Sequence, residues 1–493
     1  MLQRLIKQRW FEVLLSTVVA IGLMWRLCFY FWDVSLWHDE LLLALNIVER
    51  GPIELMGPLD YNQAAPLLFL LVVECFTLLF GDAEWVLRLL PCLSGCMAVV
   101  WMAYFGWKYL DRGVALFACG LIAFANPLTM YTVQFKQYSG DLLASVIALH
   151  LFTLVPKSSR RGVACALLIM LLPWFSFSSI FVIAGLTGGY GLFYFFQKDR
   201  DQVVRVATLG LVGGLSFIVY YYFLIRPMSA NQELVDFWQD FYFWEPWLSG
   251  RNYQLFQAGM FYIVKIHSVG TMLMLFVAAL IGLWKQPKIT LPCLMVLLVT
   301  VMASAMHKYP FCERLIVFLF PFVAIVLGQW FVLLARMERV TRLLAALTVI
   351  GLFLIHYPKN WKYLLNSPVY QEVRESFSYV EENRVAGDHV YLVPPFDRMG
   401  IYYDDYTLVS DASVLGSLSD GLLLKSISQN APFWVLSEAR RADQSEFLIQ
   451  VVDRVEALAE EFGGDDHYDL FYIEFERTML LYFKPKSAQE GSL

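Results

Sequence analysis

Three polar segments of this otherwise apolar chain carry the residue types that acid–base chemistry and anion binding require. The first is Trp37-His38-Asp39-Glu40, which directly follows a long apolar run. Adjacent carboxylates at a membrane surface are costly unless they are solvated, paired or bound to a cation. Asp39 could therefore be a general base at the head of an aqueous cavity, with Glu40 as its neighbour. The alternative is an ordinary helix N-terminus, where acidic residues are favoured.

The second segment, 134–141, carries a lysine, a tyrosine and an aspartate. Lys136 and Tyr138 could hold an anionic headgroup, while Asp141 positions a proton. In the alternative interpretation, Lys136 extends its ammonium group to the membrane surface and Asp141 caps the following helix. Taken alone, the segment favours that second interpretation.

The third segment, 307–314, places two cations around a proline. Arg314 offers a bidentate fork to phosphate and Lys308 a point charge, with Tyr309 between them. A proline break at membrane depth is tolerated chiefly where it lines a cavity. The alternative is anchoring at the interface, with Glu313 as the partner of Arg314. Three such segments on one side of a membrane would together favour a functional site.

The composition is that of a membrane protein. Hydrophobic residues make up 58% of the 493 residues and charged residues 16%, against roughly 45–50% and about 25% in soluble domains. The net charge of −6 and the absence of a basic stripe argue against binding to nucleic acid. All 8 cysteines lie in or beside apolar runs without metal-ligand spacing, so we interpret them as small core residues.

The apolar runs define the membrane topology. A spanning helix needs about 20 apolar residues, and the candidate runs are 11–32, 64–80, 86–107, 114–134, 142–155, 163–196, 203–224, 261–284, 289–306, 315–334 and 343–356. Short basic links should face the cytoplasm, and the longer acidic or aromatic links 33–62 and 226–260 should face outward. That rule holds only if 64–80 does not cross and 163–196 crosses twice, turning near 173–179. We therefore expect about 11 spans, with the N-terminus inside and the C-terminus outside.

The composition changes at Tyr357, where charges become frequent and apolar runs shorten. We expect helices at 369–383 and 445–462, and strands at 389–393, 431–436 and 468–475. The chain thus divides into a helical membrane module, 1–356, whose first outer loop is 33–86, and a small extracytoplasmic α/β domain, 357–493.

The order of the motifs resembles the GT-C superfamily of polyprenyl-phosphate-dependent glycosyltransferases. It is most similar to bacterial family-39-type enzymes, which are related to protein O-mannosyltransferases and lipid A aminoarabinose transferases. The motifs that carry the resemblance are Trp37-His38-Asp39-Glu40, Gln63-Ala64-Ala65-Pro66, Phe80-Gly81…Arg88-Leu89…Pro91, Phe135-Lys136-Gln137-Tyr138-Ser139…Asp141 and Tyr309-Pro310…Arg314-Leu315.

The resemblance implies a GT-C-like fold, membrane-parallel helices in the first outer loop, and catalysis on the outer face. It implies that Asp39 is the catalytic acid of that loop, that Asp141 is a second acidic residue, and that Arg314 meets the lipid phosphate. One departure is Gln63-Ala64-Ala65-Pro66, where some relatives have an acidic pair before the proline. That departure leaves a Mg or Mn site without one of its expected ligands, so no cofactor is assigned, and Asp39 is the residue that could bind a metal.

These observations predict an inverting glycosyltransferase of the bacterial cytoplasmic (inner) membrane. Its partners would be a polyprenyl-phosphate-linked sugar donor, a lipid, glycan or protein acceptor, and membrane lipids, but no nucleic acid. Asp39 would deprotonate the acceptor hydroxyl, and Lys308 and Arg314 would stabilise the departing phosphate. Two alternatives stay open: a lipid or sugar transporter or flippase, with charges deep within its spans, and a non-catalytic assembly subunit.

Overall fold

A computed structural model of the chain describes residues 2–32, 35–154, 159–228, 238–243, 249–264, 269–334, 338–365, 373–384, 389–392, 432–438, 468–475 and 478–485. By its internal contacts the chain divides into two units. The first unit comprises residues 1–32 and 51–366, and the second comprises residues 33–50 and 367–493.

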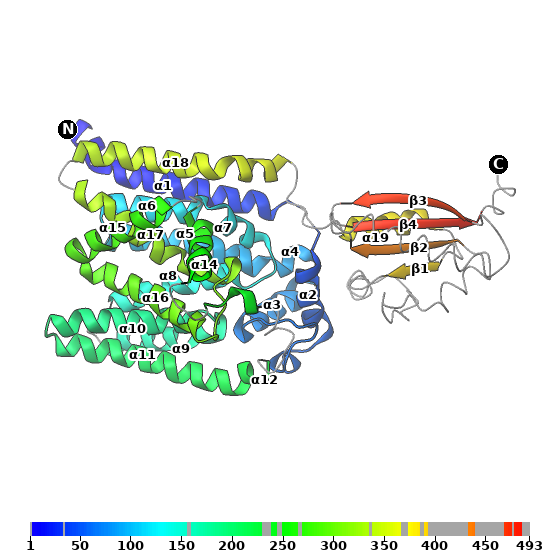
Figure 1. The fold of residues 1–493 in the computed structure, drawn as a ribbon, viewed down its shortest axis with the longest axis horizontal. Coiled ribbons are helices and arrows are strands. Elements are labelled where there is room, and N and C mark those ends of the chain that lie inside the picture. Colours follow the sequence, from blue (N-terminus) through cyan, green and yellow to red (C-terminus); the bar gives the residue numbers. More distant parts are fainter. Residues whose placement is uncertain are drawn as a thin grey trace. The chain divides into compact units, whose positions relative to one another are not determined.

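The first unit is a bundle of apolar helices (Figure 1). Its α-helices are α1 (Leu2–Tyr30), α3 (Leu67–Phe80), α4 (Glu84–Leu87), α5 (Leu89–Tyr109), α6 (Arg112–Phe124), α7 (Asn126–Met130), α8 (Tyr138–Leu154), α9 (Ser159–Phe175), α10 (Ser179–Phe196), α11 (Arg200–Tyr220), α12 (Arg226–Met228), α14 (Gly250–Val264), α15 (Val269–Lys285), α16 (Pro287–Ala305), α17 (Phe320–Gly328) and α18 (Glu338–Leu365). Shorter helical turns are η1 (Glu54–Met56), η2 (Tyr131–Val133), η3 (Tyr221–Ile225), η4 (Gln239–Phe241), η5 (Glu313–Leu319) and η6 (Gln329–Leu334).

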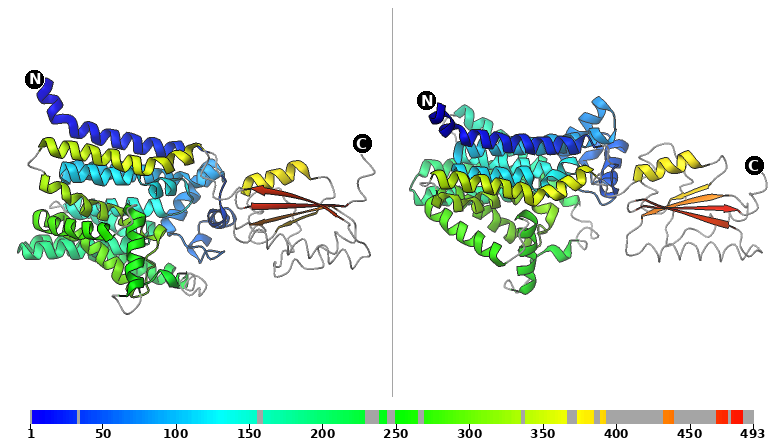
Figure 2. Two further views of the ribbon diagram at one scale, coloured as in Figure 1. Left: turned by 45° about the horizontal axis from the view of Figure 1, so that its top comes forward. Right: turned by 90° about the horizontal axis from the view of Figure 1, so that it is seen from above.

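The helices of the first unit pack around α6, α8 and α17, whose residues are nearly all buried. Helices α1 and α18 run side by side along one flank of the bundle (Figures 1 and 2). The closest approach joins α10 to α16. A Cβ on Gly185 or Gly189 would lie only 2.4 or 2.3 Å from the α16 backbone. Small residues spaced by four let two helices pack this closely in a membrane.

The chain is a multi-pass membrane protein. Among the described residues, six helices are long and apolar enough to span a bilayer, or seven if the bent pair 112–124 and 126–133 counts as one span. The expected count of about 11 is reached only if α9 and the shorter apolar helices other than α3 also cross. Helix α3 has 14 residues, so it is about 21 Å long, against a hydrocarbon core of about 30 Å. That α3 does not cross stays a prediction.

Two apolar runs are divided differently from our expectation, and one is divided as expected. The expected span 114–134 bends by 53° between Phe124 and Asn126, because Pro127 cannot continue the hydrogen bonding of α6. The expected span 261–284 begins inside α14 and continues in α15, and residues 265–268 lie outside the described part. The predicted turn within 163–196 is confirmed, since α9 ends at Phe175 and α10 begins at Ser179.

Among its described residues, the second unit contains α2 (His38–Glu49), α19 (Val373–Asn383) and four strands: β1 (His389–Leu392), β2 (Phe433–Glu438), β3 (Tyr468–Phe475) and β4 (Thr478–Pro485). The sheet order is β1-β2-β4-β3, with β1 parallel to β2 and the other pairs antiparallel. Helix α19 packs against the sheet (Figure 2), where the Tyr379 and Trp434 ring centroids are 6.4 Å apart.

The predicted α/β class of the C-terminal region is confirmed. Strand β3 has the predicted bounds, and β1, β2 and α19 overlap their predicted ranges. Strand β4 was not predicted, although it forms the centre of the sheet beside β2 and β3. The helix expected at 445–462 lies outside the described residues.

Candidate functional site

Lys136 is buried in the link between η2 and α8. The neighbouring Phe135 is completely buried and stacks on Phe69 of α3, with ring centroids 6.0 Å apart. Because this ring anchors the link, the Lys136 side chain is held inside the protein, where only 5% of its surface is exposed. Its Nζ donates a 2.6 Å hydrogen bond to Oε1 of Gln63. The expectation that Lys136 extends to the surface is therefore wrong.

The turn that carries Gln63 has an unusual backbone. Tyr61 and Asn62 have φ angles of 59° and 54°, in the left-handed region that non-glycine residues seldom adopt. Such strain persists only where surrounding contacts enforce it, and it is commonest at functional sites. Gln137 adds a contact to the same turn, because its Nε2 donates to the Ala64 carbonyl over 3.5 Å.

The segment after this turn is hydrogen-bonded to the end of α11. The N–H of Leu67, at the start of α3, donates to the Tyr220 hydroxyl over 2.9 Å. Tyr220 is the last residue of α11 before the π-helical turn η3, and such turns occur frequently at functional sites. The start of α3 is thereby fixed beside the Lys136–Gln63 pair.

Asp141 is buried in the first turns of α8, with 5% of its surface exposed. Its Oδ1 accepts a 2.5 Å hydrogen bond from Oγ of Ser176, which lies 3.1 Å from Oγ of Ser178. Both serines belong to the turn between α9 and α10. Since α8 begins at Tyr138, Asp141 is not the cap of that helix, and the capping interpretation is wrong.

The segment 306–312 turns sharply after α16. His307 has φ 52°, its N–H donates to Ser304, and the N–H of Lys308 donates to Ala303. These two bonds form the usual left-handed C-terminal cap of a helix, here with histidine in place of glycine. Lys308 is exposed as a result.

The residues after this cap point inward. Tyr309 packs on Phe181 of α10, with ring centroids 4.8 Å apart, and its hydroxyl donates to the Leu315 carbonyl over 2.8 Å. Burial raises the pKa of Tyr309 well above its ordinary value, and electrostatic interaction with Asp141 raises it further. Tyr309 therefore keeps its proton at neutral pH.

Arg314 is half-buried at the start of η5, with its guanidinium carbon 5.3 Å from the centre of the Trp238 ring. A cation over an aromatic face is stabilised electrostatically, while its N–H donors point outward in the guanidinium plane. Lys136, Tyr138 and Asp141 are thus buried in the link before α8 and in its first turns, and Tyr309 is half-buried in the segment between α16 and η5.

Asp39 and Glu40 belong to the second unit. Trp37 is the N-cap of α2, so Asp39 is the second helical residue and Glu40 the third. Glu40 is buried, and its Oε2 accepts the Trp37 backbone N–H over 3.3 Å. Glu40 therefore helps to close the start of α2, whereas Asp39 is half-buried and is not the cap.

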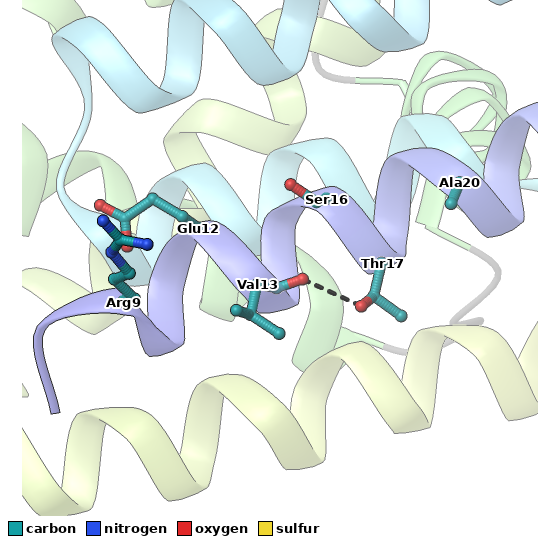
Figure 3. A pocket seen from close by; sticks show the side chains of 6 residues that line it. All are labelled: Arg9, Glu12, Val13, Ser16, Thr17 and Ala20. Carbon is teal, nitrogen blue, oxygen red and sulfur yellow. Dashed lines mark hydrogen bonds between the residues drawn. The ribbon is translucent and has the colours of Figure 1, made fainter. Parts of the chain in front are cut away.

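The structure also has a surface groove that lies away from the predicted site residues. An open groove of about 670 Å³ lies along α1 and is lined by Arg9, Glu12, Val13, Ser16, Thr17 and Ala20 (Figure 3). The predicted site residues are not among them. Within the described part of the chain, no three His, Cys, Asp or Glu residues lie close enough together to hold a metal ion.

Sequence reasoning missed two partners of the site. Ser176 holds Asp141, and its only signal was a cluster of serines in an apolar run. Gln63 was noted solely as a departure from related sequences, although it contacts Lys136 directly. Gln63 and Lys136 are 73 residues apart in the chain, so no local pattern could reveal the contact.

Comparison with known proteins gives structural matches only. No protein-family model matches the chain, and no curated protein sequence matches it. A solved structure of ArnT from Cupriavidus metallidurans bound to undecaprenyl phosphate matches with a TM-score of 0.55 and 13% identity, covering 96% of this chain and 98% of that one. The oligosaccharyltransferase AglB from Archaeoglobus fulgidus, in complex with an inhibitory peptide and a dolichol-phosphate, matches with a TM-score of 0.50 and 12% identity, covering 98% of this chain and 75% of that one. Both proteins belong to the GT-C superfamily, and the fold of this chain is the GT-C fold that its sequence motifs predicted.

Proposed function

We propose that this protein is a membrane glycosyltransferase that moves a sugar from a polyprenyl-phosphate donor to an acceptor hydroxyl. The observation that carries the proposal is the match along nearly the whole length of both chains to ArnT bound to undecaprenyl phosphate. The buried Lys136 and Asp141 support it, because charged groups inside a membrane protein are costly and usually functional. The reaction would take place on the outer face of the cytoplasmic membrane.

The proposed reaction is a single displacement with inversion. The acceptor oxygen forms a bond to the anomeric carbon while the bond between that carbon and the phosphate oxygen breaks. The acceptor proton passes to Asp39, and the polyprenyl phosphate departs with the electron pair of the broken bond. A phosphate leaving group needs charge stabilisation and little protonation, so cations can replace a second acid.

In the proposal, three cations of the first unit bind the donor and stabilise the departing phosphate. Lys136, fixed by Gln63 in a buried position, provides a pre-positioned charge for the phosphate. Arg314 provides planar donors beside Trp238, and the exposed Lys308 attracts the donor to the site. Asp141, as the second acidic residue, takes part in the acid–base step by positioning a substrate proton, with Tyr138 and Tyr309 as further residues of the donor site.

Asp39 is assigned as the base from the sequence resemblance and from its place in α2. Asp39 lies in the first turn of α2, where the helix dipole stabilises a carboxylate. Glu40 is the neighbour of Asp39 and fixes the start of α2 by accepting the Trp37 N–H. No step passes through a metal ion.

The transporter alternative predicts charges deep within spans and broken helices. Arg26 in α1 and the bend between α6 and α7 are features of this kind. Arg26, however, lies four residues before the end of α1, and its hydrogen bonds go to three backbone carbonyls. A side chain that caps backbone in this way is not part of an ion path.

Lipid analysis of a deletion strain tests the proposal. Loss of a glycosyltransferase should cause one polyprenyl-phosphate sugar to accumulate and one glycosylated product to disappear. Expression of the wild-type chain should restore the product, and expression of Asp141→Asn should not. If no polyprenyl-phosphate sugar accumulates, the proposed function is wrong.

A further inference from the structure

Arg26 is a fully buried cation in the apolar helix α1 that the proposed reaction does not use. Its Nη1 donates to the carbonyls of Gly22 and Ala123 over 3.0 and 2.8 Å, and its Nη2 donates to the carbonyl of Ile122 over 2.8 Å. Two of these three carbonyls belong to the last turn of α6. The question is why that turn needs an arginine.

The bend between α6 and α7 supplies the reason. In a continuous helix, Ala123 would accept from the N–H of residue 127, but residue 127 is a proline and has none. Ile122 would accept from Asn126, but the backbone leaves the helical conformation at Ala125, where ψ is 118°. The last bond of α6 runs from the Ala125 N–H to Leu121. The bend therefore leaves two carbonyls without helix partners, and Arg26 donates to both.

The arginine also matches the bend in charge and in packing. The C-terminal end of a helix is partly negative, so a cation there is stabilised. Gly22 lets α1 approach α6 closely, because a Cβ on Gly22 would lie 2.8 Å from the Ala123 Cβ. A buried carbonyl without a partner is costly in an apolar interior.

The bend determines where the next segment of the chain goes. Helix α7 and the turn η2 lead from Asn126 to Val133 and then directly to Lys136. Along this path the Tyr131 ring packs on Tyr138, with centroids 4.9 Å apart, and the Tyr131 hydroxyl accepts from Tyr262 over 2.7 Å. Any change in the direction of α7 would move Tyr131 and the link that carries Lys136.

We infer that Arg26 is a positioning residue of the donor site: it holds the α6–α7 bend and thereby sets the place of Lys136 and Tyr138. The inference rests on the proposed role of Lys136 in binding the lipid phosphate. Arg26 itself does not touch the substrate. Its effect on donor binding passes through residues 126–136.

The test combines Arg26→Met with Pro127→Ala in the full-length protein. Arg26→Met removes the donors to both α6 carbonyls, and Arg26→Lys keeps the charge on a compact ammonium group without the planar fork of the guanidinium group. Pro127→Ala restores an N–H that can bond to Ala123 if the helix straightens. The double variant should therefore recover thermal stability, because the carbonyl of Ala123 regains a partner. It should not recover donor binding, because a straight helix directs residues 131–136 elsewhere.

Two measurements follow these variants. Hydrogen exchange read by mass spectrometry should show faster exchange at residues 126–136 in Arg26→Met and a smaller effect in Arg26→Lys. Binding of undecaprenyl phosphate, measured by native mass spectrometry, should weaken roughly tenfold or more in Arg26→Met, because small displacements of a binding group are costly. Lys136→Ala provides the reference for loss of the phosphate contact.

A pair of glycine variants supplies the matched control. Gly22→Ala should push α1 away from Ala123 and weaken donor binding in the same direction as Arg26→Met. Gly214→Ala in α11, where nothing lies within 4 Å of the added Cβ, should leave exchange and binding unchanged.

The outcomes separate the inference from the proposed function. If Arg26→Met changes neither exchange at 126–136 nor donor binding, the inference is wrong. If the double variant recovers both stability and donor binding, Arg26 is merely structural, and the positioning role is overturned. If Lys136→Ala binds undecaprenyl phosphate normally, the proposed donor site is wrong, and the exchange data alone then decide whether Arg26 holds the bend.

Discussion

Asp141→Asn separates a catalytic carboxylate from a structural one. Asparagine has nearly the size of aspartate, and its Oδ1 can still accept the hydroxyl of Ser176. The change replaces the ionisable carboxyl group of a side chain that is 5% exposed and accepts a 2.5 Å hydrogen bond. We expect a folded protein with turnover at least about a hundredfold below that of the wild type.

The Asp141→Asn change should cost the folded protein little stability. A hydrogen bond to a charged group contributes about 1.5–3 kcal/mol and a neutral one about 0.5–1.5 kcal/mol, so the variant loses about 1 kcal/mol. Removing a buried charge offsets part of that loss. A hundredfold loss of turnover corresponds to about 2.7 kcal/mol of barrier. Unfolding cannot account for that difference if the protein stays soluble and its Tm changes little.

The assay measures transfer by purified protein from its own lipid-linked donor, once lipid analysis has identified the donor, together with Tm. Ser145→Ala is the matched control, since Ser145 is a buried serine of the same helix whose hydroxyl bonds the Asp141 backbone carbonyl. That variant should keep its activity. Wild-type turnover by Asp141→Asn would refute the functional reasoning.

Three further predictions concern the donor, the base and the topology. Gln63→Glu places a carboxylate beside the Lys136 ammonium, whose nitrogen lies 2.6 Å from the present Gln63 oxygen. The new negative charge should compete with the donor phosphate for Lys136 and lower kcat/KM for the donor about tenfold to a hundredfold, through both KM and kcat, because Lys136 also stabilises the departing phosphate in the proposal; an unchanged kcat/KM would argue against a phosphate contact by Lys136. Asp39→Asn should lose at least about a hundredfold in kcat, whereas a purely dipolar role in α2 predicts near-normal turnover in the same assay. A reporter fused after Arg161 should read cytoplasmic and one after Asn366 external; a cytoplasmic signal at Asn366 would contradict the proposed orientation.

Hydrophobicity was sufficient to locate most helices, because an apolar run must be hydrogen-bonded internally when lipid surrounds it. It could not show the bend at Pro127, since the run 114–134 stays apolar on both sides of the proline. Strand β3 could be predicted from its own residues. Strand β4 was missed because its identity depends on pairing with β2 on one side and β3 on the other, which is a tertiary property.

The residue types of the candidate site could be predicted, but their partners could not. The sequence pointed to Lys136 and Asp141 as functional, yet each also had a plausible structural role at a helix end or a membrane surface. Both side chains are buried and have internal partners, which rules out the surface and helix-cap roles: Lys136 donates to Gln63, and Asp141 accepts from Ser176. These partners come from distant segments, and only the packing of α3, α8, α9 and α10 brings them together.

The buried ionisable side chains of Arg26 and Asp141 have different local explanations. Arg26 donates to backbone carbonyls that a proline leaves without partners, so its charge is accounted for by the bend it holds. Asp141 accepts from Ser176, whose hydroxyl could equally be satisfied by the neighbouring Ser178 or by the backbone. A serine turn does not need a carboxylate, and burying one costs free energy that an asparagine would not require. Because packing does not explain this charge, the reaction is the better reason for it, and the loss of turnover in Asp141→Asn should exceed its loss of stability.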